Sequence, residues 1–259
     1  MDSLAARKAL LFSAGGVRLA LRVSALREVL EVPEREGEAG EELLARGEAL
    51  PCARVAALLG LASARAPYAL LVEGPPRAAL RVEALHGIVD LAGALVFQLP
   101  ARTFLPSPPP FSGAIVWKGE VALELAVTAL GLAPRAPAPE RPAPAADAGA
   151  PSEREIRFAR GDRAFAVPLS LLVQVLDTPR IAPVPLAPPS HLGLLCHGRA
   201  LLPVLDVAAL LGAPRGAPPG RALLLDAGGT AVAVAADRVI GPSEGEHVLR
   251  PPWDAVLAP

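Results

Sequence analysis

The residues most able to do chemistry are Cys196 and His197, the only place in the sequence where a cysteine adjoins a histidine. A thiol that gives its proton to an imidazole becomes a nucleophile. Neighbouring residues of a β-strand point to opposite faces, however, so this thiol and this imidazole cannot easily share a proton. We therefore expect a buried cysteine beside an exposed histidine, and no catalytic pair.

Zinc is the next chemistry to consider, because His191 precedes Cys196 and His197 by a few residues. These three side chains would leave a tetrahedral zinc site one ligand short, and the chain has no C-x-x-C or H-x-x-x-H spacing. We expect no metal and no other cofactor. With no coherent set of nucleophile, base and orienting group, the chain is predicted to act by binding and not as an enzyme.

The amino-acid composition argues against two classes of partner, nucleic acids and membranes. The net charge is −1 and aromatic residues make up 3% of the chain, so the basic stripe and the stacking platform of nucleic-acid binders are missing. No uncharged apolar run reaches the roughly 18 residues that indicate a membrane span, and the N-terminus does not resemble a secretory signal. We predict a cytoplasmic protein with free thiols at Cys52 and Cys196, no nucleic-acid partner and no membrane insertion.

The elements that must position any site come from an internal duplication. The stretch ALPCARVAALLG, Ala49–Gly60, returns as LLPVLDVAALLG, Leu201–Gly212. Both predict a buried strand that stops near a proline, followed by a single helical turn closed by glycine. Asp206 is expected to cap that turn in the second copy, whereas Arg54 occupies the position in the first copy and cannot.

Two further stretches repeat. Arg7–Pro33 aligns without gaps with Glu153–Pro179 and shares eight identities, and Tyr68–Ile88 aligns with Arg221–Gly241. The first pair predicts a strand, a glycine turn, a second strand, a helical turn opened by serine and a third strand. The second pair predicts a β-hairpin. A repeat of this length at a fixed offset indicates duplication of a whole domain.

The duplication sets the expected domain boundaries: a first domain at 1–132, an Ala/Pro-rich extended linker at 133–152 and a second domain at 153–259. The first copy continues through a closing hairpin, Phe111–Leu132, that the second copy lacks. The tail after Gly241 is expected to be the poorest replacement, because Pro251 and Pro252 cannot donate to a sheet ladder. We therefore predict a truncated second domain whose open edge is a binding or self-association site.

The order of these motifs resembles the CheW family of chemotaxis coupling proteins. The resemblance is carried in the first copy by Arg27-Glu28-Val29, Arg46-Gly47, Pro51, Leu58-Leu59-Gly60 and Gly113 to Leu125, and in the second copy by Gly193, Leu202, Pro203, Val204, Asp206, Leu210, Leu211, Gly212, Asp237, Val239 and Gly241. It implies a mainly β chain of two CheW-like domains, each made of two small five-stranded, SH3-like β-barrels with short helices and without catalytic activity.

The resemblance also implies partners. CheW-like domains bind the regulatory domain of the CheA-like histidine kinase and the cytoplasmic tip of a chemoreceptor, and other CheW-like domains are further candidates. The expected function is therefore a bacterial chemosensory adaptor or scaffold. The alternative is a divergent interaction module that serves another signalling or motility pathway without receptor coupling.

The predicted partner-binding residues follow from the family motifs: Arg27, Val29, Arg46 and Gly47 in the first copy, and Val175 and Arg199 in the second. The family arginine before the mid-domain glycine falls on Arg46, whereas the second copy has Gly198 there, followed by Arg199. Simpler interpretations stay open: Arg46-Gly47 as a solvated turn, Val29 and Val175 as core residues.

Overall fold

The computed structural model describes residues 4–33, 42–62, 65–74, 77–100, 103, 105–140, 154–227, 229–241 and 247–257. They fall in two compact units. The first comprises Met1–Leu99, Leu105–Ala138 and Val184–Ala187, and the second Pro100–Phe104, Pro139–Pro183 and Pro188–Pro259. None of the described helices has the length and hydrophobicity needed to cross a bilayer.

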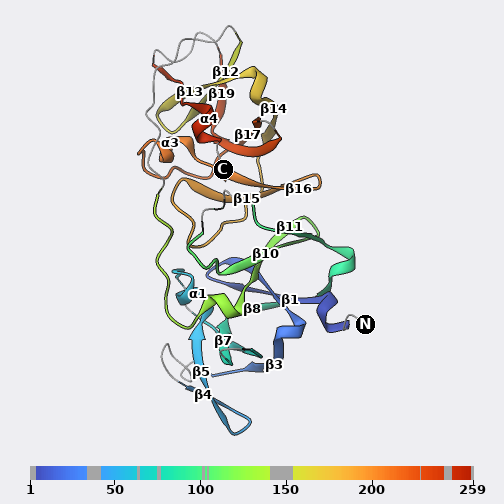
Figure 1. Cartoon of the computed structure of the whole chain (residues 1–259). Helices are drawn as coiled ribbons and strands as arrows, with labels where there is room; N and C mark the ends of the chain where they lie inside the picture. Colours follow the sequence, from blue (N-terminus) through green and yellow to red (C-terminus); the bar gives the residue numbers. More distant parts are fainter. Residues whose placement is uncertain are drawn as a thin grey trace. The chain divides into compact units, whose positions relative to one another are not determined.

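The first unit begins with a six-stranded sheet in the order β8-β1-β2-β11-β10-β9 (Figure 1). Its strands are β1 (Lys8–Ala14), β2 (Val17–Arg22), β8 (Ala84–Asp90), β9 (Leu95–Phe97), β10 (Phe111–Trp117) and β11 (Glu120–Leu125). Neighbours run antiparallel except β2 and β11, which are parallel. One face carries a core of buried apolar residues that includes Leu11, Val89, Ile115 and Ala122.

A five-stranded sheet completes the first unit, in the order β3-β6-β7-β5-β4. Its strands are β3 (Leu26–Glu31), β4 (Glu42–Ala45), β5 (Glu48–Arg54), β6 (Tyr68–Val72) and β7 (Ala78–Val82). Short helices are α1 (Val55–Leu58) and α2 (Val127–Leu130), with 3-10 turns at Leu4–Arg7, Val23–Ala25 and Leu91–Gly93. β6 and β7 alternate little because both of their faces are buried.

The second unit also holds two sheets, of four strands in the order β19-β12-β13-β20 and of five in the order β14-β17-β18-β16-β15. The strands are β12 (Glu155–Arg160), β13 (Arg163–Pro168), β14 (Leu172–Asp177), β15 (His191–His197), β16 (Ala200–Leu205), β17 (Arg221–Ala227), β18 (Thr230–Ala236), β19 (Arg238–Ile240) and β20 (Val248–Leu249). The helices are α3 (Val207–Leu210) and α4 (Trp253–Val256), with a 3-10 turn at Leu169–Leu171.

The predicted mainly β fold class is confirmed. The five-stranded sheets of the two units have the same strand order, element for element, as a duplication requires. The strand number differs from the expected five in the other two sheets, which have six strands in the first unit and four in the second. The difference arises because the second unit has no counterpart of β9 and β10 among its described residues.

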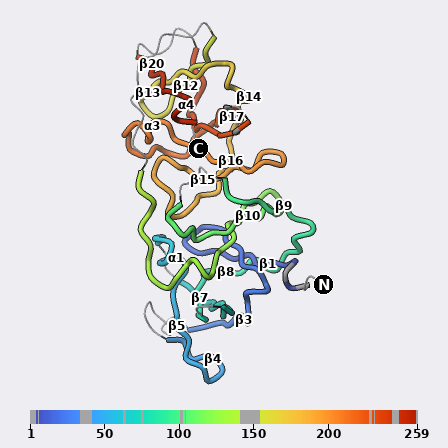
Figure 2. The backbone as a smooth tube through the Cα atoms, in the orientation of Figure 1, coloured from blue at the N-terminus to red at the C-terminus, as the bar shows by residue number. Residues whose placement is uncertain are grey.

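The C-terminal tail corrects one expectation. β20 runs parallel to β13 and pairs Leu249 with Phe165, the residue equivalent to Leu19, which pairs with Leu123 of β11 in the first unit. α4 then follows β20 as α2 follows β11, and Figure 2 shows β20 beside β13. The prediction that the tail is the poorest filler is wrong. Its prolines follow the two paired residues instead of interrupting them, so no ladder donor is lost.

The expected linker lies largely outside the described residues, which include only 133–140 of it. Within that part Arg135 is bound to the first unit: its guanidinium donates to the carbonyl oxygens of Ala129 and Pro108, and its peptide N–H donates to that of Leu58. The proposed domain boundary at residue 132 therefore precedes a segment that still packs on the first unit.

Candidate partner-binding surfaces

In the first unit, strand β3 and the β4–β5 hairpin bring the predicted partner-binding residues together. Arg46 and Gly47 form the two-residue turn of that hairpin with φ of 49° and 81°, the positive values that such tight turns require. The Arg46 Nε and Nη2 atoms donate to the two carboxylate oxygens of Glu28 at 2.9 and 2.7 Å. This hydrogen bonding lowers the pKa of Glu28, so the carboxyl group stays ionised. Arg46 is therefore exposed but already paired.

A second group of ion pairs lies beside the first. Arg27 is 3.2 Å from a Glu48 oxygen and 3.8 Å from a Glu73 oxygen, and Arg77 approaches the same two carboxylates at 3.5 and 3.8 Å. Exposed pairs of this kind contribute little to stability, so a partner can exchange them for its own charges. We call the six residues Arg27, Glu28, Arg46, Glu48, Glu73 and Arg77 the charged surface of the first unit. Leu44, 74% exposed, adjoins it on β4.

The equivalent region of the second unit has a different chemistry. Val173 and Gln174 on β14 stand where Arg27 and Glu28 stand on β3. Val173 is 60% exposed, and Leu169 in the preceding turn is 48% exposed. β14 is an edge strand, paired with β17 alone in its sheet. We call Leu169 and Val173 the apolar surface of the second unit.

The other predicted site residues occupy less prominent positions. Val29 and Val175 are half-buried and pair across the sheet with Leu70 and Leu223, which fits their alternative interpretation as core residues. Arg199 lies exposed in the β15–β16 turn after Gly198, away from β14 in sequence. Their roles in binding stay predictions.

Sequence reasoning missed Arg160, whose guanidinium is buried in the second unit. It donates to the Asp206 carboxylate at 2.9 and 2.6 Å and to Asp237 at 2.7 Å. Asp206 also accepts from the N–H groups of Ala208 and Ala209, which confirms the predicted helix cap. The first copy has Ala14, Arg54 and Glu83 at the three equivalent positions, so this network belongs to the second unit alone.

Cys196 and His197 are both half-buried, which corrects the expectation of a buried cysteine beside an exposed histidine. Burial raises the pKa of the Cys196 thiol, which therefore stays protonated at neutral pH. His191 is buried with neither ring nitrogen hydrogen-bonded, and burial lowers its pKa to about 4. Within the described residues no three His, Cys, Asp or Glu side chains are grouped to hold a metal ion.

The structure also corrects the prediction of an open edge in the second unit, because β20 pairs with β13 on the side that was expected to be free. β20 pairs only two residues, and prolines follow it. Beside it Glu155 binds Arg250 at 2.9 Å and Arg157 at 3.1 Å. Glu155 and Arg157 stand where the first unit has the core residues Ala9 and Leu11. Short strands, prolines and inward charges all discourage the addition of another strand.

Comparison with known proteins identifies the family that the chain matches. The model of the CheW-like domain matches the chain twice, over residues 8–132 and 156–246. The crystal structure of the scaffolding protein TtCheW from Thermoanaerobacter tengcongensis is similar, with 18% sequence identity and a TM-score of 0.34 over 46% of this chain and 88% of that one. A search of curated proteins found no match.

Proposed function

The chain belongs to the CheW-like domain family, and from that premise we propose that it is a non-enzymatic chemosensory adaptor that couples chemoreceptors to a CheA-type histidine kinase. Two family domains in one chain let one molecule hold two partners, or two copies of one partner. Linked binding sites raise the effective concentration of the second partner once the first is bound.

The observation that carries the proposal is the divergence between equivalent surfaces. Arg27 of β3 is ion-paired with Glu48, whereas Val173 at the equivalent position of β14 is an exposed apolar residue. If both units bound the same partner through this strand, similar chemistry would be expected at these positions. We infer that the charged surface binds the regulatory domain of the kinase and the apolar surface binds the receptor tip.

Calorimetric titration of the full chain tests this assignment. Arg27→Glu is expected to weaken binding of the kinase regulatory domain and to leave binding of a receptor tip fragment unchanged. Val173→Asp is expected to do the reverse, because a carboxylate on an apolar contact must be desolvated. Each variant is the control for the other. Equal effects of both variants on both partners contradict the assignment, and absence of binding to either partner contradicts the adaptor function.

One observation favours the alternative function, an interaction module of another pathway without receptor coupling. The described residues of the second unit form no counterpart of β9 and β10. They form instead the short strand β20 and the ion pair between Glu155 and Arg250, so the two units differ in architecture. Neighbouring genes for a CheA-like kinase, receptors and a methyltransferase support the adaptor. Their absence, together with kinase binding but no receptor binding, supports the alternative.

A further inference from the structure

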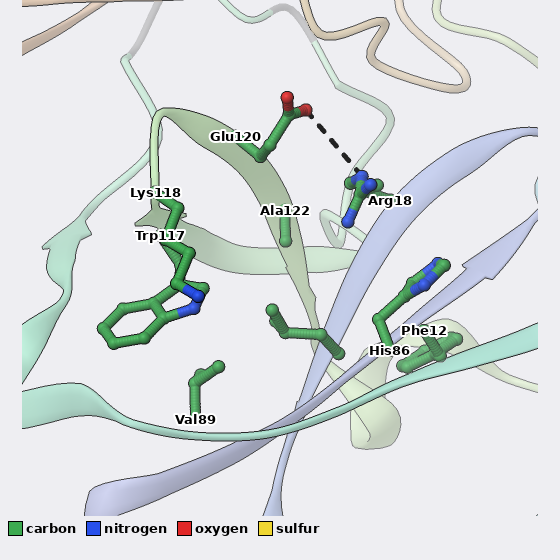
Figure 3. A pocket seen from close by; sticks show the side chains of 9 residues that line it. Phe12, Arg18, His86, Val89, Trp117, Lys118, Glu120 and Ala122 are labelled. Carbon is green, nitrogen blue, oxygen red and sulfur yellow. Dashed lines mark ion pairs between the residues drawn. The ribbon is translucent and has the colours of Figure 1, made fainter.

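The first unit contains a pocket of about 300 Å³ lined by residues of its six-stranded sheet. The lining side chains, drawn in Figure 3, come from β1, β2, β8, β10 and β11 and from the turn between β10 and β11. Its floor is formed by the apolar residues Leu11, Val89 and Ala122, all of them buried, and the Trp117 ring stands at one side. Pockets of this size with an apolar floor and a few polar groups are the usual form of small-molecule sites.

The polar groups of the pocket are mainly basic. Arg18, His86 and Lys118 line it together with a single carboxylate, that of Glu120, which lies 3.8 Å from the Arg18 Nε atom. The Lys118 ammonium lies 5.9 Å from the centre of the Trp117 ring. Partial burial and, as the smaller cause, the nearby Arg18 charge lower the pKa of His86. The positive charges of Arg18 and Lys118 therefore outnumber the negative charge of Glu120, and the rim of the pocket favours a bound anion.

A β-bulge brings His86 to this position. Phe12 pairs with Leu85 and Leu11 pairs with Gly87, so His86 is an additional residue in the ladder between β1 and β8. Gly87 takes a φ of +103°, a value that suits glycine, as this local bend requires. Bulges of this kind redirect a side chain and are frequent next to functional sites.

The second unit supplies an internal comparison, because β12 and β19 pair in it as β1 and β8 pair in the first unit. β12 and β19 pair in continuous register, with no additional residue at the position of His86. Arg18 corresponds to Ala164 and Leu11 to Arg157, and the described residues of the second unit form no counterpart of β10, the strand that contributes Trp117. The bulge, the basic rim and the aromatic wall occur together in the first unit, and the described part of the second unit has none of the three. Sheet geometry alone therefore does not require them.

We propose that this pocket binds a small amphipathic anion, with a carboxylate at the rim between Arg18, His86 and Lys118 and a flat apolar group against Trp117 and the floor. Arginine and lysine both donate charge-assisted hydrogen bonds to carboxylates, and an aromatic wall favours a planar apolar group. Such a ligand goes beyond the adaptor function and would make the first unit a small-molecule sensor in its own right.

The test uses the full chain and three probes of graded chemistry: indole-3-acetate, which carries both features, indole, which lacks the charge, and acetate, which lacks the ring. NMR follows the indole N–H signal of Trp117 and the ring signals of His86. Indole-3-acetate is expected to shift both signals in a saturable way and to raise the pKa of His86, because a bound anion stabilises the imidazolium. Indole and acetate are each expected to bind at least tenfold more weakly.

Two variants of pocket residues and one control variant test whether the ligand binds at this pocket. Arg18→Ala, which introduces the residue of the second unit, and Lys118→Gln should each weaken indole-3-acetate at least tenfold with an unchanged circular dichroism spectrum. Arg77→Gln, an exposed arginine elsewhere in the same unit, should leave the affinity unchanged. Equal binding of indole and indole-3-acetate overturns the proposal, as does an affinity that Arg18→Ala and Lys118→Gln leave unchanged. The absence of shifts at Trp117 at millimolar indole-3-acetate also overturns it.

Discussion

Replacement of Trp253 by alanine is expected to destabilise the second unit strongly. Trp253 begins α4 in the C-terminal tail and is 7% exposed. Its indole N–H donates to the Ala166 carbonyl oxygen at 2.8 Å, and its ring lies 6.4 Å from that of Phe158. This one side chain thus joins the tail to β12 and β13.

The magnitude follows from burial. A tryptophan side chain that removes about 200 Å² of apolar surface from water contributes up to roughly 5 kcal/mol. The lost hydrogen bond adds about 1 kcal/mol, while partial collapse of the cavity and residual burial in the unfolded chain reduce the total. We expect a loss of about 3–5 kcal/mol, the usual range for Trp→Ala in a core. Domains have only about 5–15 kcal/mol of stability, so the loss is a large part of it.

Hydrogen exchange of the full chain, followed by mass spectrometry, measures this loss unit by unit. Peptides from β12 and β13 should exchange roughly 150- to 5,000-fold faster in Trp253→Ala, the fold-change that corresponds to about 3–5 kcal/mol, whereas peptides from β1 and β2 should not change. Trp253→Phe keeps a ring without the donor and should cost only about 1–2 kcal/mol. Val127→Ala tests the equivalent position of the first unit. Unchanged protection of β12 and β13 in Trp253→Ala would refute the structural role of the tail.

Three further predictions concern other parts of the chain. Asp206→Ala should cost about 3–5 kcal/mol in urea denaturation because it leaves the Arg160 guanidinium buried without that partner, and Asp206→Ala combined with Arg160→Leu should recover much of the loss; a loss below about 1 kcal/mol contradicts this. The pKa of His191 is about 4 in the folded chain and 6.5 otherwise, so the unfolded state binds the proton first and stability falls as the pH drops below 6.5, by about 3 kcal/mol at pH 4. His191→Leu should remove that part of the pH dependence, and an identical pH profile rules the explanation out. Arg46→Gly should leave the melting temperature unchanged, because Gly198 occupies the same turn position in the second unit, yet should weaken binding of the kinase regulatory domain; a sharp fall in melting temperature would mean that Arg46 is structural.

The sequence was a good guide wherever local chemistry repeats. The gapless alignment of Arg7–Pro33 with Glu153–Pro179 predicted two strands joined by a glycine turn, then a helical turn and a third strand in each unit. The observed elements follow this order. Asp206 was recognisable as a cap because a cap depends on residues two and three positions away. Turns and caps are local, so a single sequence carries the information for them.

The missed features depend on residues far apart in the chain. Arg160 meets Asp206 and Asp237 only after three strands have assembled, and no spacing in the sequence indicates that pairing. The tail was misjudged because its prolines were weighed without knowing the register, which places them beyond the paired residues. Register also decides the bulge at His86, where one additional residue is visible only against the partner strand.

The pairing of Arg46 with Glu28 shows a further limit. The family motif singled out Arg46 as a partner-binding residue, but a motif does not tell whether the side chain is already engaged within its own unit. The structure gives it a bidentate carboxylate partner on β3. An acidic partner must therefore displace Glu28, so that binding through Arg46 is an exchange of one ion pair for another and adds specificity more than affinity.

Reconstitution of receptor control over the kinase tests the central claim most directly. A CheA-type histidine kinase is mixed with vesicles that carry its chemoreceptor, and autophosphorylation is measured with and without the full chain. The kinase is expected to become responsive to the receptor only when the chain is present, and Arg27→Glu and Val173→Asp are each expected to abolish the response while the basal kinase rate is unchanged. A kinase that responds to the receptor equally without the chain, or not at all with it, would contradict the adaptor function.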